Sequence, residues 1–354
     1  MLYWSGVMAS MVPSPQPGDV LAGKYVLKER IGVGGMGVVF LADHAPTARR
    51  VAIKVLHSHL RGNATAARRF RDEALAARRV QHRGAVTVIE YGSPDGGAPF
   101  MAMELVHGSS LARMIEENDL PLPRVLGILD QLLDALGAAH ACGVVHADVK
   151  SDNVMVSAQG GDDVVTLVDF GLAQLDGEMV EPGMVAGTPE YLAPELIRGK
   201  APTIASDLYA AGVILYELLT GATPFAVGTT SKILQRHLLE APVAPSRRRP
   251  DRDIPAALDR IVLRALEKAP AARFASAQEL RDALAAVALE GEAACGAGAK
   301  AGAHGEHAGQ PRLARGSEPG GTGRDETWAA LACADDHDTI VDLDRDLDID
   351  LADR

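Results

Sequence analysis

The hydrophobic pattern of the chain changes character once, near residue 109, and this change limits the possible folds most strongly. Residues 24–91 contain short apolar runs that alternate like strands around glycines, with one helical pattern over 64–79. Beyond Ser109 apolar residues recur at helical spacing, and residues 205–221 are apolar nearly all round, as in a buried central helix. Strands followed by helices indicate an α+β fold with two lobes.

The pattern predicts four segments. Residues 1–20 are expected to be a flexible extension, 21–106 a small antiparallel-sheet lobe with one helix, and 107–289 a larger, mainly helical lobe. Residues 290–354 are rich in Gly, Ala and acidic residues with few large apolar ones, so we expect a disordered acidic tail. Its last part alternates aliphatic and acidic residues, and would form a strand only against a partner.

Composition narrows the functional classes. Asp and Glu outnumber Lys and Arg by 47 to 35, a net charge of −12, which argues against a general nucleic-acid binder. The three cysteines lack the spacing of a zinc site or a disulfide framework, so a reducing compartment is expected. Neither a membrane span nor a signal peptide is recognisable. We therefore expect a cytoplasmic protein.

A glycine-rich run, IGVGGMGVVF, begins the part of the chain that carries chemistry. Gly32, Gly34 and Gly37 form G-x-G-x-x-G, a pattern that dinucleotide-binding folds share. Those folds place a helix directly after the glycines, whereas here GVVFLAD continues as a strand. A glycine hairpin lets backbone N–H groups approach phosphate oxygens, which a Cβ would obstruct. The run therefore predicts a phosphate-binding hairpin.

Lys54 ends the β-branched strand VAIK. A surface lysine is the default interpretation, but the hairpin upstream makes it similar to the lysine that pairs with nucleotide phosphates. Such a lysine needs a carboxylate to orient it. Glu73 on the following helix is the candidate, and Asp72 beside it is the competitor.

Residues 146–153 read HADVKSDN, followed by VDFG at 168–171 and GTPEYLAPE at 187–195. Together with the glycine hairpin and Lys54, these motifs resemble those of the bacterial eukaryotic-like (Hanks-type) serine/threonine protein kinases, over about residues 20–288. The resemblance implies a two-lobed protein-kinase fold. It also implies transfer of the ATP γ-phosphoryl group to Ser/Thr hydroxyls of protein substrates, with Mg²⁺, or Mn²⁺ as an alternative.

The resemblance assigns roles residue by residue. Asp148 would orient the substrate hydroxyl and accept its proton, and Lys150 would neutralise charge on the moving phosphoryl group. Asn153 and Asp169 would hold Mg²⁺. Lys54, oriented by Glu73, would pair with the phosphates.

The nucleotide site implied by the resemblance combines the hairpin with the strand that follows it and the connection between the lobes. Taken singly, each apolar member is nearly as well explained as plain core. The predicted set is Ile31, Gly32, Gly34, Gly35, Gly37, Val39, Ala52, Lys54, Met103, Glu104, Val106 and Met155.

Other residues have structural roles by resemblance. Thr188 and Glu195 belong to a platform that supports the peptide substrate, and Glu195 would form a buried ion pair with Arg273. Asp207, at the start of the apolar helix, would fix the backbone of the 146–153 loop.

Ala147 departs from the family pattern, which has arginine before the catalytic aspartate. That arginine commonly binds a phosphorylated residue of the activation loop, and does no chemistry on ATP. The loop at 172–186 contains no Ser, Thr or Tyr, so the phosphate acceptor is absent together with its receptor. We therefore predict activity that is independent of activation-loop phosphorylation.

Two other functional classes remain open. A pseudokinase scaffold would bind ATP and partner proteins without catalysis, although the catalytic residue types are all present. A small-molecule phosphotransferase shares H-x-D-x-x-x-x-N but lacks the platform with Arg273.

The tail suggests a partner. Thr339 has Asp342 three residues later, a spacing that resembles the phosphothreonine sites of forkhead-associated domains, and Thr327 is a second acceptor in an acidic setting. The hypothesis is that the tail is autophosphorylated and recruits such a domain. An uninvolved acidic tail is at least as good an explanation.

Overall fold

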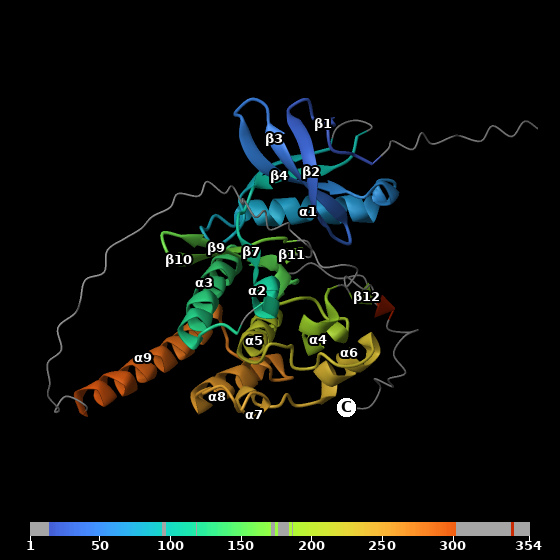
Figure 1. Ribbon diagram of the computed structural model, residues 1–354. Helices are drawn as coiled ribbons and strands as arrows, with labels where there is room; N and C mark the ends of the chain where they lie inside the picture. Colours follow the sequence, from blue (N-terminus) through green and yellow to red (C-terminus); the bar gives the residue numbers. More distant parts are fainter. Residues whose placement is uncertain are drawn as a thin grey trace, which may run out of the picture.

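The computed structural model describes residues 14–93, 97–117, 119–170, 174–175, 184–185, 187–301 and 341–342. At 174–175, 184–185, 290–301 and 341–342 it describes the backbone alone. A sheet with one helix beneath it forms the upper lobe, and a helical lobe lies below (Figure 1). This two-lobed α+β architecture confirms the predicted fold class.

The small lobe is built on a six-stranded antiparallel sheet with the order β1-β2-β3-β4-β6-β5. Its β-branched central strands are covered on both faces. Val51, Ile53 and Val55 of β4 pack into one apolar cluster, whereas Ala52 and Leu56 pack into the main core. Because side chains alternate along a strand, Lys54 lies on the main-core face. The strands are β1 (Val20–Leu21), β2 (Tyr25–Val33), β3 (Gly37–His44), β4 (Arg49–Leu56), β5 (Val88–Gly92) and β6 (Phe100–Glu104).

Helix α1 (Ala64–Arg79) packs beneath this sheet, over the range that the sequence predicted (Figure 1). Asn63 begins it, because its side-chain oxygen accepts the N–H groups of Thr65 and Ala66. The buried face includes Phe70, Glu73 and Ala77, at helical spacing. A carboxylate is therefore carried into the core beside β4.

The large lobe is organised around α5 (Ile204–Thr220), which is buried over almost its whole circumference. Gly221 ends it in the left-handed conformation at φ 81°. The other helices of this lobe are α2 (Leu111–Glu117), α3 (Leu122–Ala141), α4 (Pro194–Ile197), α6 (Thr230–Leu239), α7 (Pro245–Arg248), α8 (Ala256–Ala265) and α9 (Ala277–Ala301), with short 3-10 helices η2 (Ser151–Asn153), η3 (Pro189–Tyr191) and η4 (Pro270–Ala272). A further 3-10 helix, η1 (Ser58–Leu60), lies in the small lobe between β4 and α1.

Short strands lie where the two lobes meet. A hairpin of β9 (Val154–Gln159) and β10 (Asp162–Leu167) pairs with β7 (Ser109–Ser110). Asn153 immediately precedes this hairpin and Asp169 follows it closely. The antiparallel pairing of β9 with β10 therefore brings together two residues that are far apart in the chain.

Two further strand pairs involve the segment after Asp169. β8 (Val144–Val145) pairs with β11 (Gln174–Leu175), and β12 (Met184–Val185) pairs with β13 (Val341–Asp342). The second pair joins the tail to the segment before the platform. The tail thus has a strand partner within the same chain.

The elements of both lobes extend past the predicted boundaries. Gly18 donates a backbone hydrogen bond to Leu27, and Leu27 donates one to Asp19. The small-lobe sheet therefore begins before residue 21. At the other end α9 is helical to Ala301, past the expected end at 289, because alanine-rich sequence favours helix even without large apolar residues.

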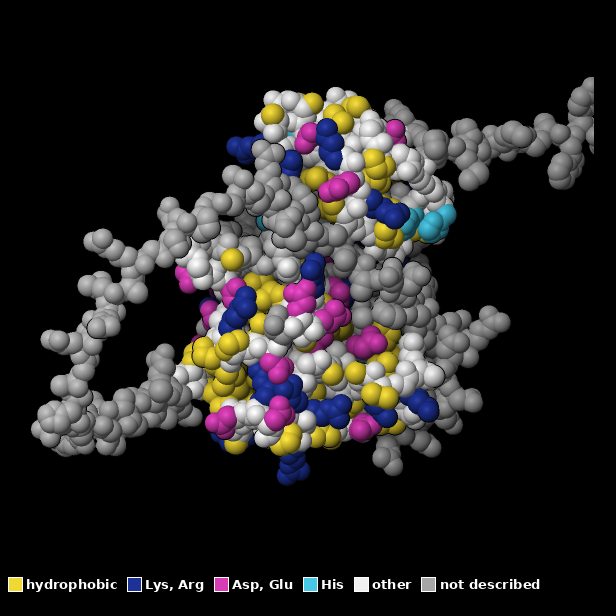
Figure 2. All heavy atoms as spheres, viewed as in Figure 1, with side chains coloured by type: hydrophobic (Ala, Val, Ile, Leu, Met, Phe, Trp, Pro, Cys, Tyr) yellow, Lys and Arg dark blue, Asp and Glu magenta, His cyan; other side chains and the backbone are white. Residues whose placement is uncertain are grey.

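The surface of the large lobe carries charges of both signs. On the face shown in Figure 2, basic and acidic side chains are interspersed with apolar ones. Arg249, for example, contacts both Asp119 and Asp251. Among the helices of the described ranges, none has the length and apolar character needed to cross a bilayer.

Candidate active site

Lys54 lies between two carboxylates at the centre of the site. Its Nζ is 2.7 Å from Oε1 of Glu73 on α1 and 2.5 Å from Oδ1 of Asp169 after β10. Lys54 and Glu73 are almost completely buried. Asp72 points elsewhere and pairs with Arg68 on the outside of α1. Helix phase thus selects Glu73 over its neighbour as the partner of Lys54.

The charges of these three groups decide their protonation. Burial alone would lower the pKa of Lys54, but the charges of Asp169 and Glu73 outweigh it and raise the pKa. Burial raises the pKa of Glu73, against the effect of Lys54. Burial alone would raise the pKa of Asp169, but the positive charge of Lys54 outweighs this effect and lowers the pKa. Lys54 and Asp169 therefore stay charged near neutral pH.

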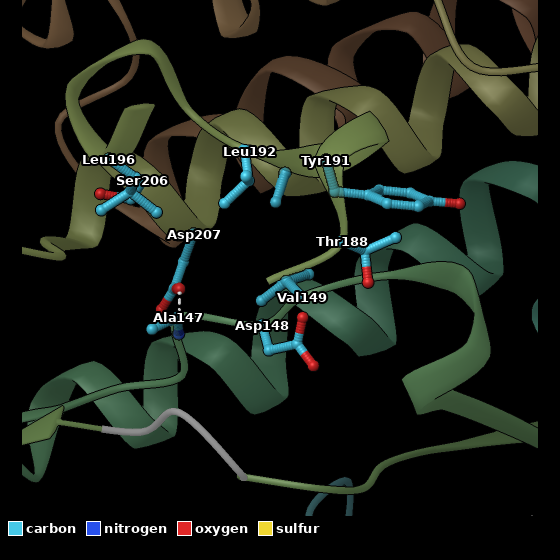
Figure 3. A pocket seen from close by; sticks show the side chains of 10 residues that line it. Ala147, Asp148, Val149, Thr188, Tyr191, Leu192, Leu196, Ser206 and Asp207 are labelled. Atoms are coloured by element: carbon cyan, nitrogen blue, oxygen red, sulfur yellow. Dashed lines mark hydrogen bonds between the residues drawn. The ribbon is translucent and has the colours of Figure 1, made fainter. Parts of the chain in front are cut away.

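Asp207, in the first turn of α5, holds the backbone at the start of the 146–153 loop. Its Oδ2 accepts the N–H of His146 and its Oδ1 that of Ala147, both at 2.9 Å. Figure 3 shows this carboxylate directed at Ala147. Ala147 has φ 64°, a left-handed conformation that costs a non-glycine residue about 1 kcal/mol. His140 also contacts Oδ2 of Asp207, at 2.8 Å.

His146 supports the loop as a neutral ring. Its Nδ1 accepts the N–H of Asp148, so the proton lies on Nε2, which is 3.3 Å from the carbonyl oxygen of Val168. Burial lowers the pKa of His146, which agrees with this tautomer. The ring also packs on Phe170, with centroids 4.6 Å apart. The ring links the loop to the chain on both sides of Asp169.

Asp148 is held in place by two polar neighbours. Nδ2 of Asn153 donates to its backbone carbonyl at 2.9 Å and to its Oδ2 at 3.2 Å. Nζ of Lys150 lies 3.3 Å from the same Oδ2 and donates to the hydroxyl of Thr188 at 2.9 Å. The platform is thereby tied to the loop that carries Asp148. Figure 3 shows Asp148 and Thr188 on facing segments.

A second link between the loop and the platform involves Glu217, which lies outside every recognised motif. The hydroxyl of Tyr191 donates to Oε2 of Glu217 at 2.8 Å and also bonds Ser151 at 2.8 Å. Burial raises the pKa of Glu217 to about 7, against the hydrogen bond from Tyr191. Tyr191 belongs to the GTPEYLAPE motif. The presence of a tyrosine there is the sequence signal that could have pointed to a buried hydrogen-bond partner such as Glu217.

Glu195 and Arg273 form a buried bidentate ion pair. The two guanidinium nitrogens lie 2.7 and 2.8 Å from the two carboxylate oxygens. The remaining Arg273 donors bond the carbonyl oxygens of Ala205, Glu267 and Lys268. The pair ties the platform to the connection between α8 and α9.

The apolar residues of the predicted adenine site are buried or half-buried in the main core. Five buried members of the set belong to one apolar cluster, at the junction of β2, β3, β4, β6 and β9; they are Ile31, Val39, Ala52, Met103 and Met155. Glu104 ends β6 with an exposed side chain, and its N–H donates to Thr87. Val106 is half-buried against the same cluster. The glycine hairpin connects β2 to β3 above these residues.

The donor set fits Mg²⁺. Asp169 offers carboxylate oxygens, and Asn153, whose Nδ2 is engaged by Asp148, offers its amide oxygen. Mg²⁺ prefers oxygen ligands. Proteins usually bind it with only one or two side chains, together with the phosphates of the substrate. A dedicated cage of three or more His, Cys, Asp or Glu residues does not occur within the described ranges.

Ala147 lines a small cavity between the loop and the platform, with room for about one water molecule. Asp148, Tyr191 and Ser206 line it too (Figure 3). Thr327 and Thr339 lie outside the described residues, as does most of the 172–186 loop.

Comparisons with known proteins agree with this geometry. The model of the protein kinase domain matches residues 25–284. The chain is similar to serine/threonine-protein kinase pkn3 of Myxococcus xanthus, with 42% identity over 278 residues, which are 76% of this chain and 51% of that protein. It is also similar to PknH of Mycobacterium tuberculosis, with 38% identity over 261 residues, 73% of this chain and 41% of the other.

The fold has solved counterparts. The kinase domain of Mycobacterium tuberculosis PknI superimposes with a TM-score of 0.61 at 31% identity, covering 77% of this chain and 98% of that one. The chain spans about half the length, or less, of the curated relatives it matches. The extent of the match and the assembled site lead to one conclusion. The chain belongs to the protein kinase domain family.

Proposed function

We propose that the chain is a protein serine/threonine kinase that acts in the cytoplasm on protein acceptors and uses ATP with Mg²⁺. One observation carries the proposal. Lys54 contacts both Glu73 and Asp169, so the three groups that the family uses around the phosphates lie in contact. The similarity to proteins named serine/threonine-protein kinases supports the same class of acceptor.

In the reaction, the oxygen of a Ser or Thr hydroxyl forms a bond to the γ-phosphorus while the bond from that phosphorus to the ADP oxygen breaks. Bound Mg²⁺ supplies positive charge that stabilises the phosphate oxygens. Asp148 orients the hydroxyl and takes its proton. Asn153 and Lys150 keep the Asp148 carboxylate in place. Asp169 and Asn153 are the residues that would hold the metal.

The platform supports a peptide acceptor in this proposal. Thr188 is bonded to Lys150, and Tyr191 to Ser151, so the segment that would carry the peptide is fixed to the catalytic loop at two points. Small-molecule phosphotransferases have no need of such an arrangement. A protein acceptor is therefore the better interpretation.

The direct test is transfer of labelled γ-phosphate from Mg·ATP to a library of Ser- and Thr-containing peptides. The full chain should label the library, and the Asp148→Asn variant should do so at least a hundredfold more slowly. A full chain that binds Mg·ATP tightly but labels no peptide would favour the pseudokinase scaffold.

We further propose that this transfer needs no phosphate on the activation loop. Ala147 replaces the arginine that would bind such a phosphate, and residues 172–186 contain no hydroxyl acceptor. Asp207 holds the start of the 146–153 loop, and Lys150 bonds the platform through Thr188. These contacts involve no phosphorylated group.

The tail is proposed as an autophosphorylated docking segment for a forkhead-associated domain, with Thr339 and Thr327 as acceptors. The pairing of β13 with β12 supports a relation between the tail and the segment before the platform. Binding of a recombinant forkhead-associated domain should require prior incubation with Mg·ATP. It should be lost in Thr339→Ala and kept in Thr47→Ala, a control near the sheet. Equal binding by both variants would leave the tail as a solvated acidic segment.

A further inference from the structure

The tip of the glycine hairpin rests on the end of strand β4. Gly34 donates its N–H to the carbonyl of Gly37 at 2.8 Å, and Gly37 donates back at 3.3 Å. A Cβ on Gly37 would lie 2.4 Å from the carbonyl oxygen of Val55, so only glycine allows this approach. The turn at Gly35 and Met36 is thereby brought next to the residues that follow Lys54.

His57, three residues after Lys54, makes two hydrogen bonds to this turn. Its backbone N–H donates to the carbonyl of Met36 at 3.0 Å. Its ring Nε2 lies 2.8 Å from the carbonyl oxygen of Gly34. A carbonyl only accepts, so Nε2 carries the proton and donates it. One residue thus fixes both sides of the hairpin tip.

The surroundings of His57 favour this one orientation of the ring. The side chain is half-buried, and its other ring contact is a stack on His59, with centroids 5.2 Å apart and planes at 24°. His59 is exposed and belongs to η1. Stacking limits rotation of the His57 ring and keeps Nε2 directed at Gly34.

We propose that His57 is a positioning residue for nucleotide binding, which holds the glycine hairpin at a fixed distance from Lys54. The inference rests on the proposed function. Glycine-rich turns have many accessible conformations. When a ligand binds only one of them, the loss of conformational entropy lowers the binding affinity. A hydrogen bond that selects the conformation before binding reduces that cost. Removing it weakens nucleotide binding without touching the residues that transfer the phosphate.

The test compares three variants by binding of Mg·ADP in calorimetry and by steady-state kinetics. His57→Phe keeps a ring for the stack and removes the donor. His57→Gln offers an amide N–H at about the reach of Nε2. His59→Phe is the matched control, because it changes the neighbouring ring and leaves the bond to Gly34.

The proposal predicts that His57→Phe raises the Kd for Mg·ADP and the KM for ATP about three- to tenfold, with kcat within about twofold. His57→Gln should recover most of the loss, and His59→Phe should bind like the wild type. Should the phenylalanine variant not fold, His57→Ala provides the same comparison without added bulk.

Two results would overturn the proposal. One is nucleotide binding by the variant without the donor that equals the wild type. The other is a glutamine variant as weak as the phenylalanine variant, which would assign the effect to ring packing. Because binding is measured without transfer, a wild type that binds Mg·ADP but transfers no phosphate would refute the proposed function and still test His57.

Discussion

Two buried ion pairs in this molecule are built differently. In the pair of Glu195 with Arg273, both carboxylate oxygens and every guanidinium nitrogen are engaged. At the other site, the ammonium group of Lys54 contacts the carboxylates of both Glu73 and Asp169. Oε2 of Glu73 is buried there with no hydrogen-bond partner among the described residues. The first pair is complete as it stands. The second leaves a buried carboxylate oxygen without a partner, which suits a site that is completed by a ligand.

The difference teaches that burial and pairing alone do not identify a functional residue. Lys54, Glu73, Glu195 and Arg273 are all almost inaccessible to solvent, and each pair joins different elements of the fold. What separates them is whether the polar groups are satisfied without a ligand. Variants at the two sites should accordingly affect different properties.

The largest expected effect is on activity at the incomplete site. Asp169→Asn should lower kcat by about a thousandfold or more, because a ligand for the metal and a partner of Lys54 is lost. The melting temperature should move by only about 3 °C or less, since Lys54 keeps Glu73. Asp43→Asn, which removes an exposed pair with Lys28, is the control and should change neither property appreciably. Strong destabilisation by Asp169→Asn would erase the contrast between the two sites.

The complete site should show the opposite result. Glu195→Gln leaves the Arg273 charge buried without its counter-charge, a change that typically costs about 3–5 kcal/mol. Thermal unfolding should therefore begin roughly 10 °C lower. Transfer by protein that is still folded should fall far less than in Asp169→Asn. An unchanged melting temperature would mean that the pair is not part of the supporting structure.

Glu217 sharpens the comparison, because it is a half-buried carboxylate whose hydrogen-bond partners, Tyr191 and Ser151, are neutral hydroxyls. Its folded-state pKa, about 7, lies above the ordinary value. A carboxyl with a raised pKa contributes stability below pH about 4.5, and the contribution is lost as pH rises through 7. Glu217→Gln should remove this loss, at ~1.4 kcal/mol for each pKa unit. Melting temperatures measured from pH 5 to 8 should converge or cross for the two proteins, and parallel curves would contradict the assignment.

The smallest expected effect is at Ala147. Restoring the family's arginine with Ala147→Arg should change kcat/KM by about twofold or less, because residues 172–186 offer no phosphate for it to bind. Steady-state kinetics on the unphosphorylated protein measures this directly. A many-fold gain in turnover would show that the loop is poorly ordered in the natural sequence.

The sequence predicted the fold and the central site because both depend on patterns that run along the chain. The helix over 64–79 and the motifs around Asp148 and Asp169 are local, and their order fixes the lobe arrangement. Which of Asp72 and Glu73 pairs with Lys54 does not follow from the local sequence. Only packing of Phe70 and Ala77 against the core settles which carboxylate faces inward.

Other features lie outside the recognised motifs of the sequence. The bond from His57 to Gly34 joins a side chain to a backbone carbonyl, which every residue possesses. The link from Tyr191 to Glu217 joins segments 26 residues apart whose contact depends on how α5 packs. Helix α9 continues to Ala301, past the predicted boundary at 289, because alanine favours helix even where large apolar residues are few.

The central claim is that the protein transfers phosphate without phosphorylation of its activation loop. Phosphosite mapping tests this claim most directly. Purified protein is incubated with Mg·ATP, beside an Asp169→Ala control, and then analysed by mass spectrometry. The account predicts new phosphate on Ser or Thr residues of the wild type alone, with the tail threonines Thr339 and Thr327 foremost. Absence of phosphate from the wild type and from added acceptors, despite measurable ATP binding, would contradict the account.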